Sequence, residues 1–258
     1  MLLKARTAVA ALAVGVLSLT ACGGSSSEDS GSALVTDGTL TVCTAVPYDP
    51  FEYVEDGEYT GFDIELSREI ATGLGLELQV QNVSFDGLQS GTVLAAGQCD
   101  MIAAAMSITD EREEKLAFSD PYYESFQSLL VPADSAVAGF DDLSGRKLRV
   151  QLGTTGALYA QDHTAGDTEV VSFESEGELF QALGAGTIDA VMQDLPVNQN
   201  HTDGGKFTIA ATYETDEVYG FALPKTGSEE LVSQVNEQLT ALRDNGMYQE
   251  LHDKYFAE

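Results

Sequence analysis

The strongest constraint on the fold is an alternation of short apolar strands with amphipathic helical segments. Residues 40–44 are an apolar strand pattern, and residues 76–80 alternate apolar and polar side chains like a strand with one buried face. Between them, Phe62, Leu66 and Ile70 fall at helical spacing. Because strands that alternate with helices form a parallel sheet covered by helices, the sequence predicts an α/β fold.

The same alternation continues along the chain. Further helices are expected over about residues 86–96, 157–162 and 178–183, and further strands over 100–105, 129–132, 149–152, 170–171 and 188–192. An amphipathic helix is expected at the C-terminal end, with a break at Gly246 before a second helical piece. Segments 97–103 and 186–192 both place Gly-x-x-Asp between a helix and an apolar strand. This repetition favours two lobes of like construction with a ligand cleft between them, although such joints occur in any α/β chain.

The N-terminal end has the pattern of an export signal. Lys4 and Arg6 precede an apolar run over residues 8–19, which is too short to cross a bilayer and is typical of a signal peptide. The run ends in Leu19-Thr20-Ala21-Cys22, which resembles the lipobox of bacterial lipoproteins. We therefore expect residues 1–21 to be removed and Cys22 to receive lipid. A plain signal peptide that ends near a cysteine is the alternative.

Residues 22–36 are rich in Gly, Ser and acidic side chains, which predicts a flexible tether before a folded part that starts near residue 37. The expected location is extracytoplasmic, with the protein anchored by its lipid to the outer face of the cell membrane. Of the 258 residues, 12 are Lys or Arg and 42 are Asp or Glu, for a formal net charge of −30. So strong a negative charge excludes nucleic acid as a partner.

Two cysteines, Cys43 and Cys99, remain after Cys22 is assigned to lipidation. An oxidising compartment permits a disulfide between them without requiring it. If their strands are parallel neighbours, Cys43 lies late in one and Cys99 early in the other, which places them at the limit of a disulfide's reach. The sequence leaves the bond open and slightly favours free thiols.

The candidates for catalysis are few. His163, His201 and His252 stand far apart, in polar or acidic surroundings and without metal-ligand spacing, so they are expected to be surface histidines. The sequence has no Gly-x-Ser-x-Gly elbow, no phosphate-binding loop and no dinucleotide fingerprint. We expect no enzyme activity, no metal and no cofactor.

The candidates for binding are better defined. Ser107-Ile108-Thr109-Asp110-Glu111-Arg112 follows an apolar strand directly, so it lies at the ligand-facing end of the predicted sheet. The Arg112 guanidinium suits a carboxylate, although a salt bridge to a neighbouring Glu is an equal alternative. Gly153-Thr154-Thr155-Gly156 at a strand-to-helix turn offers N–H groups and hydroxyls to an anion, but a plain turn is the commoner outcome.

Three further residues occupy loops beyond strands. Asp194 follows the expected strand 188–192 and suits a cation, whereas Tyr48 and Phe85 suit the apolar walls of a pocket. An arginine and backbone donors on one side, with an aspartate on the other, fit the carboxylate and ammonium of a free α-amino acid.

From about residue 38 to 256 the chain resembles the polar amino acid-binding proteins of ABC importers, of the glutamine-, histidine- and lysine/arginine/ornithine-binding type. The motifs that carry this resemblance are Pro50-Phe51-Glu52-Tyr53, Gly61-Phe62-Asp63-Ile64-Glu65-Leu66, Ser107-Ile108-Thr109-Asp110-Glu111-Arg112, Phe118-Ser119-Asp120-Pro121-Tyr122-Tyr123, Gln193-Asp194-Leu195-Pro196 and Tyr219-Gly220-Phe221-Ala222. The resemblance implies a two-lobed periplasmic-binding-protein fold (type II), each lobe having a mainly parallel sheet flanked by helices. Lobe 1 would comprise residues 37–123 and 220–258 and lobe 2 residues 124–219, with hinge strands near 122–126 and 215–219.

The resemblance also implies roles for the site residues. The aromatic rings of Tyr48 and Phe85 would sandwich the ligand, and Arg112 would clamp its α-carboxylate with help from the turn at Thr154 and Thr155. The α-ammonium would be received by a second group of residues, namely Ser107, the backbone at Ala104 and Ala105, and Asp194.

Departures from the family pattern bear on the ligand. Ala45 stands where several relatives have an acidic residue, and Gln151 stands where the glutamine binder has a lysine. A second cation is not expected in the pocket, so a neutral polar amino acid such as glutamine is favoured, although Asp49 and Glu52 remain available to a cationic one. The expected partners are an amino acid and the permease subunits, and the protein is expected to be a monomer. A cyclohexadienyl dehydratase-like enzyme on the same fold is the alternative.

Overall fold

The computed structural model describes residues 34–202 and 204–256, which belong to one compact unit, Gly31–Glu258. The predicted signal peptide, Cys22 and most of the tether lie outside the described residues. The strands are β1 (Thr39–Thr44), β2 (Tyr53–Glu55), β3 (Glu58–Thr60), β4 (Glu77–Asn82), β5 (Met101–Ile102), β6 (Leu116–Phe118), β7 (Tyr123–Pro132), β8 (Lys147–Gln151), β9 (Glu169–Phe173), β10 (Ala190–Asp194), β11 (Phe207–Tyr219) and β12 (Ala222–Pro224).

The helices follow the strands in the predicted alternation. They are α1 (Phe62–Gly73), α2 (Phe85–Gln89), α3 (Thr92–Ala95), α4 (Asp110–Glu113), α5 (Thr155–His163), α6 (Glu176–Gly184), α7 (Leu195–Asn200), α8 (Glu229–Asp244) and α9 (Met247–Phe256), with a short 3-10 helix at Phe140–Leu143. Within residues 34–202 and 204–256, no helix is both long and apolar enough to cross a membrane.

Two five-stranded sheets organise these elements. The first has the strand order β4-β1-β5-β12-β6 and the second the order β11-β7-β10-β8-β9. The predicted α/β fold is confirmed. The sheets are mixed rather than mainly parallel, because each sheet combines two parallel pairings, made by β1 or β8, with two antiparallel pairings, made by β12 or β7.

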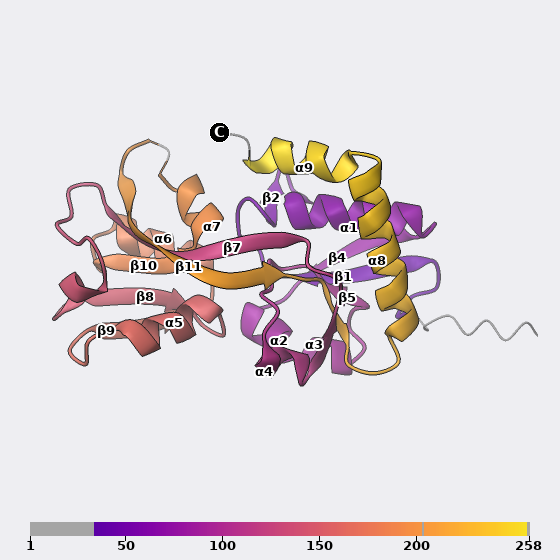
Figure 1. The fold of residues 1–258 in the computed structure, drawn as a ribbon, viewed down its shortest axis with the longest axis horizontal. Coiled ribbons are helices and arrows are strands. Elements are labelled where there is room, and N and C mark those ends of the chain that lie inside the picture. The colour runs from indigo at the N-terminus through magenta and orange to yellow at the C-terminus, as the bar shows by residue number, and fades with distance from the viewer. Residues whose placement is uncertain (1–33, 203, 257–258) are drawn as a thin grey trace, which may run out of the picture. The chain divides into compact units, whose positions relative to one another are not determined.

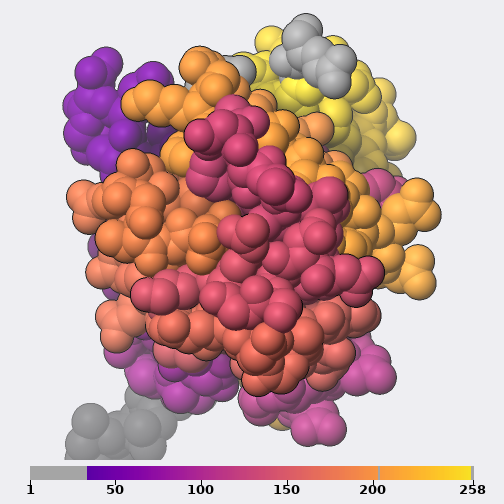
Figure 2. Space-filling view, turned by 90° about the vertical axis from the view of Figure 1, so that its left-hand side faces the viewer, coloured from indigo at the N-terminus to yellow at the C-terminus, as the bar shows by residue number. Residues whose placement is uncertain are grey.

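The chain passes from the first sheet to the second and then returns. It leaves along β7 and comes back along β11, and these two strands pair antiparallel with Tyr219 opposite Tyr123. The first half, with the first sheet, α1–α4, α8 and α9, therefore unites both ends of the described chain, and the second half contains its middle (Figure 1). In Figure 2 the middle of the chain, coloured rose to orange, builds most of the visible face. The lobe boundaries and the hinge stay predictions.

The first half has the larger apolar core. Helix α1 buries Phe62, Leu66 and Ile70 as its spacing predicts, and α8 buries Leu231, Val235, Leu239 and Leu242 against the same cluster. Aromatic rings dominate this core: Phe51, for example, has its ring centroid 5.0 Å from that of Tyr123 and 5.3 Å from that of Tyr219. Such edge-on contacts add to the burial energy.

Two expected elements are shorter than predicted. The helix expected over residues 86–96 is two short helices, because Gly91 adopts a left-handed backbone (φ 74) between α2 and α3. The strand expected over 100–105 is only Met101–Ile102, and the chain turns at Ala105 (φ 43).

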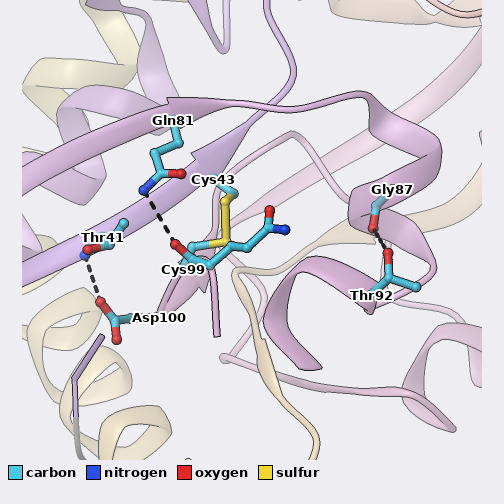
Figure 3. Close-up of a disulfide and its surroundings, with 8 residues drawn as sticks. Thr41, Cys43, Gln81, Gly87, Thr92, Cys99 and Asp100 are labelled. Carbon is cyan, nitrogen blue, oxygen red and sulfur yellow. Dashed lines mark hydrogen bonds between the residues drawn. A yellow bond between two sulfur atoms is a disulfide. The ribbon is translucent and has the colours of Figure 1, made fainter. Parts of the chain in front are cut away.

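Cys43 and Cys99 form a disulfide, which the sequence had slightly disfavoured (Figure 3). The register pairs Cys43 with Ile102, as a parallel arrangement requires. Cys99 nevertheless reaches it, because it lies before β5, where the chain turns after Gly97 (φ 64) and the Asp100 N–H bonds the Thr41 carbonyl at 2.8 Å. The two Cα atoms are thereby 5.8 Å apart.

Candidate functional site

One pocket is lined by residues from both halves of the chain. Its lining contains every residue predicted to contact a ligand: Tyr48, Phe85, Ala104, Ala105, Ser107, Arg112, Gln151, Thr154, Thr155 and Asp194. Ala45 and Glu52 complete the lining. The structure thus brings the predicted residues together, and their roles toward a ligand stay predictions.

Arg112 lies in α4, which follows β5 of the first sheet after a short connection. The side chain of Thr109 caps this helix by accepting a hydrogen bond from the Arg112 backbone N–H at 3.2 Å. Arg112 as a whole is 5% exposed; its Nη1 donates to the Ser107 carbonyl at 2.7 Å and its Nη2 to the Gly153 carbonyl at 3.0 Å. It therefore connects the two halves of the chain.

The alternative salt bridge between Arg112 and a neighbouring Glu is not seen among the described residues, since Glu111 pairs with Lys115 instead, at 2.9 Å. The guanidinium lies 5.3 Å from the centroid of the Phe85 ring, within cation–π range. Burial lowers the pKa of Arg112, which nonetheless stays cationic. Because its two carbonyl contacts use only part of its five N–H donors, the guanidinium still has donors for an anion.

The predicted glycine turn lies where β8 gives way to α5. Gly153 has a left-handed backbone (φ 80), and Thr154 caps the helix by accepting a hydrogen bond from the Ala157 N–H at 3.1 Å. The start of α5 thus faces the same pocket as Arg112. The first N–H groups of a helix favour an anion.

Asp194 is the last residue of β10, which runs two residues further than the predicted strand over 188–192. It is 6% exposed and accepts hydrogen bonds from the hydroxyls of Tyr48 (2.7 Å) and Tyr219 and from the Gln127 side-chain amide. Burial, and next the negative charge of Glu217, raise the pKa of Asp194 to about 6. The carboxyl therefore favours the arrival of a cationic group.

Glu217 was not predicted, although it touches two of the predicted site residues. Its Oε2 accepts hydrogen bonds from Ser107 Oγ and from Thr155 Oγ1, each at 2.7 Å, and its Oε1 accepts one from Gln127 Nε2 at 3.1 Å. The register of β11 against β7 shifts between Tyr213 and Glu217. Because such a shift changes which side chains face inward, the alternation of residues in this strand carried no usable signal.

Glu52, which the sequence left available to a cationic ligand, lies in the pocket lining. It is 1% exposed, and within the described part of the chain its Oε2 has no hydrogen-bond partner. Burial, followed by the nearby charges of Asp63 and Glu176, raises the pKa of Glu52 well above its usual value. A buried carboxyl of this kind stays protonated unless a cation or hydrogen-bond donor reaches it.

The histidines stand apart from the pocket lining. His163 Nδ1 lies 2.8 Å from the Tyr159 carbonyl, and His201 Nε2 lies 3.0 Å from Glu176 Oε1. His252 packs among aromatic rings, with its centroid 5.0 Å from that of Phe256. Over residues 34–202 and 204–256, no group of three or more His, Cys, Asp or Glu side chains is arranged to hold a metal ion.

Comparison with known proteins places the chain. The model of the bacterial extracellular solute-binding proteins, family 3, matches residues 40–258. A curated relative from Neisseria gonorrhoeae, named "Probable histidine-binding protein", is 30% identical over 256 residues, which cover 96% of this chain and 94% of the relative.

Solved structures agree with this relationship. The structure described as "An ancestral arginine-binding protein bound to glutamine" has a TM-score of 0.80 at 33% identity and covers 86% of this chain and 100% of its own. An ancestral amino acid-binding protein described as a precursor of cyclohexadienyl dehydratase has a TM-score of 0.77 at 34% identity, covering 85% of this chain and 95% of its own. Because the family model and these relatives all span most of the chain, the protein belongs to the bacterial extracellular solute-binding proteins, family 3.

Proposed function

We propose that this protein captures a polar L-amino acid in the pocket and delivers it to the permease of an ABC importer. The observation that carries the proposal is the presence of a buried guanidinium, Arg112, and a buried carboxyl, Asp194, from opposite halves of the chain in one pocket. A free amino acid carries a carboxylate and an ammonium on one carbon, so these two groups match its two charges.

Each predicted residue has a role in this proposal. Arg112 clamps the α-carboxylate with its remaining N–H donors, helped by the start of α5 at Thr154 and Thr155. The α-ammonium is received by Asp194, by Ser107 and by the backbone at Ala104 and Ala105.

The rings of Tyr48 and Phe85, each 8% exposed, enclose the ligand from its two faces. Gln151, which is 3% exposed at the end of β8, contacts the ligand as a neutral polar group.

Glu52 supports a neutral polar ligand such as glutamine. A protonated carboxyl both donates and accepts a hydrogen bond, and a carboxamide side chain does the same in the complementary order. Because burial raises the pKa of Glu52, the pocket favours this protonated form. An acidic ligand side chain is disfavoured, since Asp194 in the pocket lining and Glu217 behind Ser107 and Thr155 carry like charge.

Calorimetry tests the proposal. The protein is unfolded, freed of co-purified ligand, refolded and titrated with the common L-amino acids at pH 8. We expect a neutral polar amino acid to bind with a Kd below about 100 µM, a binding free energy of about −5.5 kcal/mol. Binding of none of them at that level contradicts the proposal.

A cationic amino acid is a second candidate, because Glu52 Oε2 has no hydrogen-bond partner among the described residues and would ionise beside a cation. The two ligand classes are distinguished by pH. Binding of arginine with an ionised Glu52 weakens up to tenfold per pH unit below the raised pKa of Glu52, whereas binding of glutamine stays constant there. Glu52→Gln should abolish arginine binding and leave glutamine binding within about threefold.

We also propose that the protein acts as a monomer held at the outer face of the cell membrane by lipid on Cys22. Cys22→Ser should release the protein from the membrane fraction and abolish incorporation of labelled palmitate.

Sedimentation of the soluble form should give a monomer mass. Transport of the labelled amino acid should fall in cells that lack the protein and return when it is supplied.

An enzyme on this fold remains a second class of function. A general acid and base in one cleft are needed for dehydration, and Asp194 and Glu52 are two buried carboxyls in one pocket. Incubation with prephenate or arogenate, followed by absorbance, discriminates the two classes. We expect no turnover, and turnover lost in Asp194→Asn would favour the enzyme.

A further inference from the structure

Asp63 is a buried carboxyl that the proposed ligand contacts do not use. It lies in the first turn of α1, is fully buried, and has its backbone N–H 2.9 Å from the Phe51 carbonyl. No described residue pairs it with a cation. A buried carboxyl without a cationic partner destabilises a fold. We therefore expect Asp63 to have a structural or functional role that offsets this cost.

Both hydrogen bonds of Asp63 go to one oxygen. Oδ2 accepts a bond from the Ala105 N–H at 2.8 Å and one from the Tyr122 hydroxyl at 2.7 Å. Tyr122 is itself fixed, because its ring stacks on that of Phe221 with centroids 4.4 Å apart and its N–H bonds the Tyr219 carbonyl at 2.8 Å. The carboxyl is thus held in one place by the core beneath the pocket.

Ala105 is one of two described residues other than glycine with a left-handed backbone; its φ is 43°. That conformation costs a residue with a Cβ free energy and persists only where the surroundings enforce it. Ala105 also lines the pocket, next to Ala104. The strained residue is therefore the one that Asp63 holds, and it forms part of the ligand-facing wall.

We propose that Asp63 is a positioning residue for ligand binding: its hydrogen bond keeps Ala105 left-handed and so fixes the backbone wall that faces the ammonium of the ligand. The effect on affinity rests on the proposed function, whereas the effect on Ala105 is independent of any ligand. The motif Gly61-Phe62-Asp63 would thus support the site through the hydrogen bond from Ala105 to Asp63, although none of its side chains lines the pocket.

A purely structural role for Asp63 is the competing explanation. An acid in the first turn of a helix stabilises that helix through its dipole. In that case, its loss lowers stability but leaves Ala105 and ligand affinity as they were. Groups that face Asp63, namely Glu52, Tyr122 and Tyr248, are unchanged in every variant used below.

Four proteins test the proposal at pH 8: the wild type, Asp63→Asn, Ala105→Gly and the double variant. Asparagine keeps the shape of Asp63 and removes its charge, and glycine at position 105 adopts the left-handed backbone without strain. We expect Asp63→Asn to weaken binding of the cognate amino acid at least tenfold in the Ala105 background and less than threefold in the Ala105→Gly background. Ile70→Val, in the same helix, should lower the Tm and leave Kd unchanged.

A second readout needs no ligand. Amide exchange, followed by NMR, should show the Ala105 N–H losing at least tenfold of its protection in Asp63→Asn. The proposal is overturned if Asp63→Asn weakens binding equally with alanine and with glycine at position 105. It is also overturned if the protection of the Ala105 N–H is unchanged. If the wild type binds no amino acid, the proposed function fails, while the exchange measurement still decides the role of Asp63.

If Asp63→Asn does not fold, the wild-type protein suffices. The amide proton of Ala105 should move downfield as Asp63 ionises between pH 5 and 9, because its acceptor gains charge. A shift that stays constant over that range overturns the proposal.

Discussion

The two halves of the pocket are built differently. Site residues of the first half stand on a frame that includes the Cys43–Cys99 disulfide, the Asp63–Ala105 bond and the large aromatic core. Site residues of the second half lie at the start of α5 and the end of β10, over smaller apolar clusters. The described part of the second half has no disulfide.

This contrast indicates that the two halves contribute differently to binding. A site half fixed by covalent and buried polar contacts is preorganised, so it loses little entropy when ligand arrives. In the proposed function, the other half completes the site through Thr154, Thr155 and Asp194. We expect substitutions in the first half to weaken the initial binding of the ligand. Substitutions in the second half should instead affect the step in which the two halves close around it.

Removal of the guanidinium should have the largest effect. Arg112→Ala is expected to weaken binding by about 3 to 5 kcal/mol, because the carboxylate would then be buried without a partner. Asp194→Asn, in the second half, should cost less, since three donors already satisfy that carboxyl. Calorimetry of both variants measures the difference, with Arg68→Ala on the surface as control. Equal losses at Arg112 and Asp194 would contradict the proposed asymmetry.

Loss of the disulfide should rank next. It joins residues separated by 56 positions. Cys43→Ser with Cys99→Ser is expected to lower the free energy of unfolding by about 2 to 4 kcal/mol. Phe85 packs in the same apolar cluster as both cysteines, so a several-fold loss of affinity should accompany it. Urea unfolding of the double variant and of the reduced wild type should agree, and an unchanged midpoint would rule out a structural role for the bond.

Stability should fall as pH rises. Burial raises the pKa of Asp63 and Glu176 to about 7 and, with Glu217, that of Asp194 to about 6. The folded protein therefore keeps protons that the unfolded chain has already lost, and its free energy of unfolding decreases from about pH 4 to pH 7. We expect a loss of more than about 1.4 kcal/mol between pH 5 and 8, the equivalent of one group shifted by one unit.

Calorimetric Tm values over this range check that expectation and separate the halves. Asp63→Asn, in the first half of the chain, should reduce the fall of Tm with pH. Glu176→Gln, in the second half, should reduce it as well. Glu250→Gln, on an exposed part of α9, should leave the slope intact. A Tm that rises from pH 5 to 8 would contradict the assignment.

The smallest effect is expected at the hydrogen bonds of Glu217, which touch Ser107 from the first half and Thr155 from the second. Glu217→Gln should reduce glutamine affinity by about 0.5 to 1.5 kcal/mol, because the hydroxyls keep a weaker, neutral partner. It should also lower the pKa of Asp194 below its value of about 6, since Glu217 is the second largest cause of that shift. NMR titration of the Asp194 carboxyl measures this. Glu214→Gln, exposed on the same strand, should change neither quantity.

Sequence patterns predicted the strand-helix alternation and most of the pocket lining, while Ala104, Ala105 and Gln151 came from the family resemblance. Arg112 was found because its motif follows directly on an apolar strand, and Thr154 because a glycine turn joins a strand to a helix. Such local signals need no knowledge of register.

Contacts that depend on register were missed. The disulfide depends on where the chain turns after Gly97, and the contacts of Glu217 with Ser107 and Thr155 follow a register change in β11 just before it. The single helix expected over 86–96 ignored the left-handed Gly91. A glycine inside a helical pattern does not reveal its φ, so its effect as a break emerges only in three dimensions.

The hydrogen bond between the Tyr48 hydroxyl and Asp194 gives the protein an optical signal. The chain has no tryptophan among its 258 residues, so its emission comes from tyrosine. A phenol bonded to a carboxylate is quenched, and two of these tyrosines, Tyr48 and Tyr219, share Asp194. In the proposed function, an ammonium that draws Asp194 away from them should brighten both, so tyrosine fluorescence of the unlabelled protein should report its occupancy.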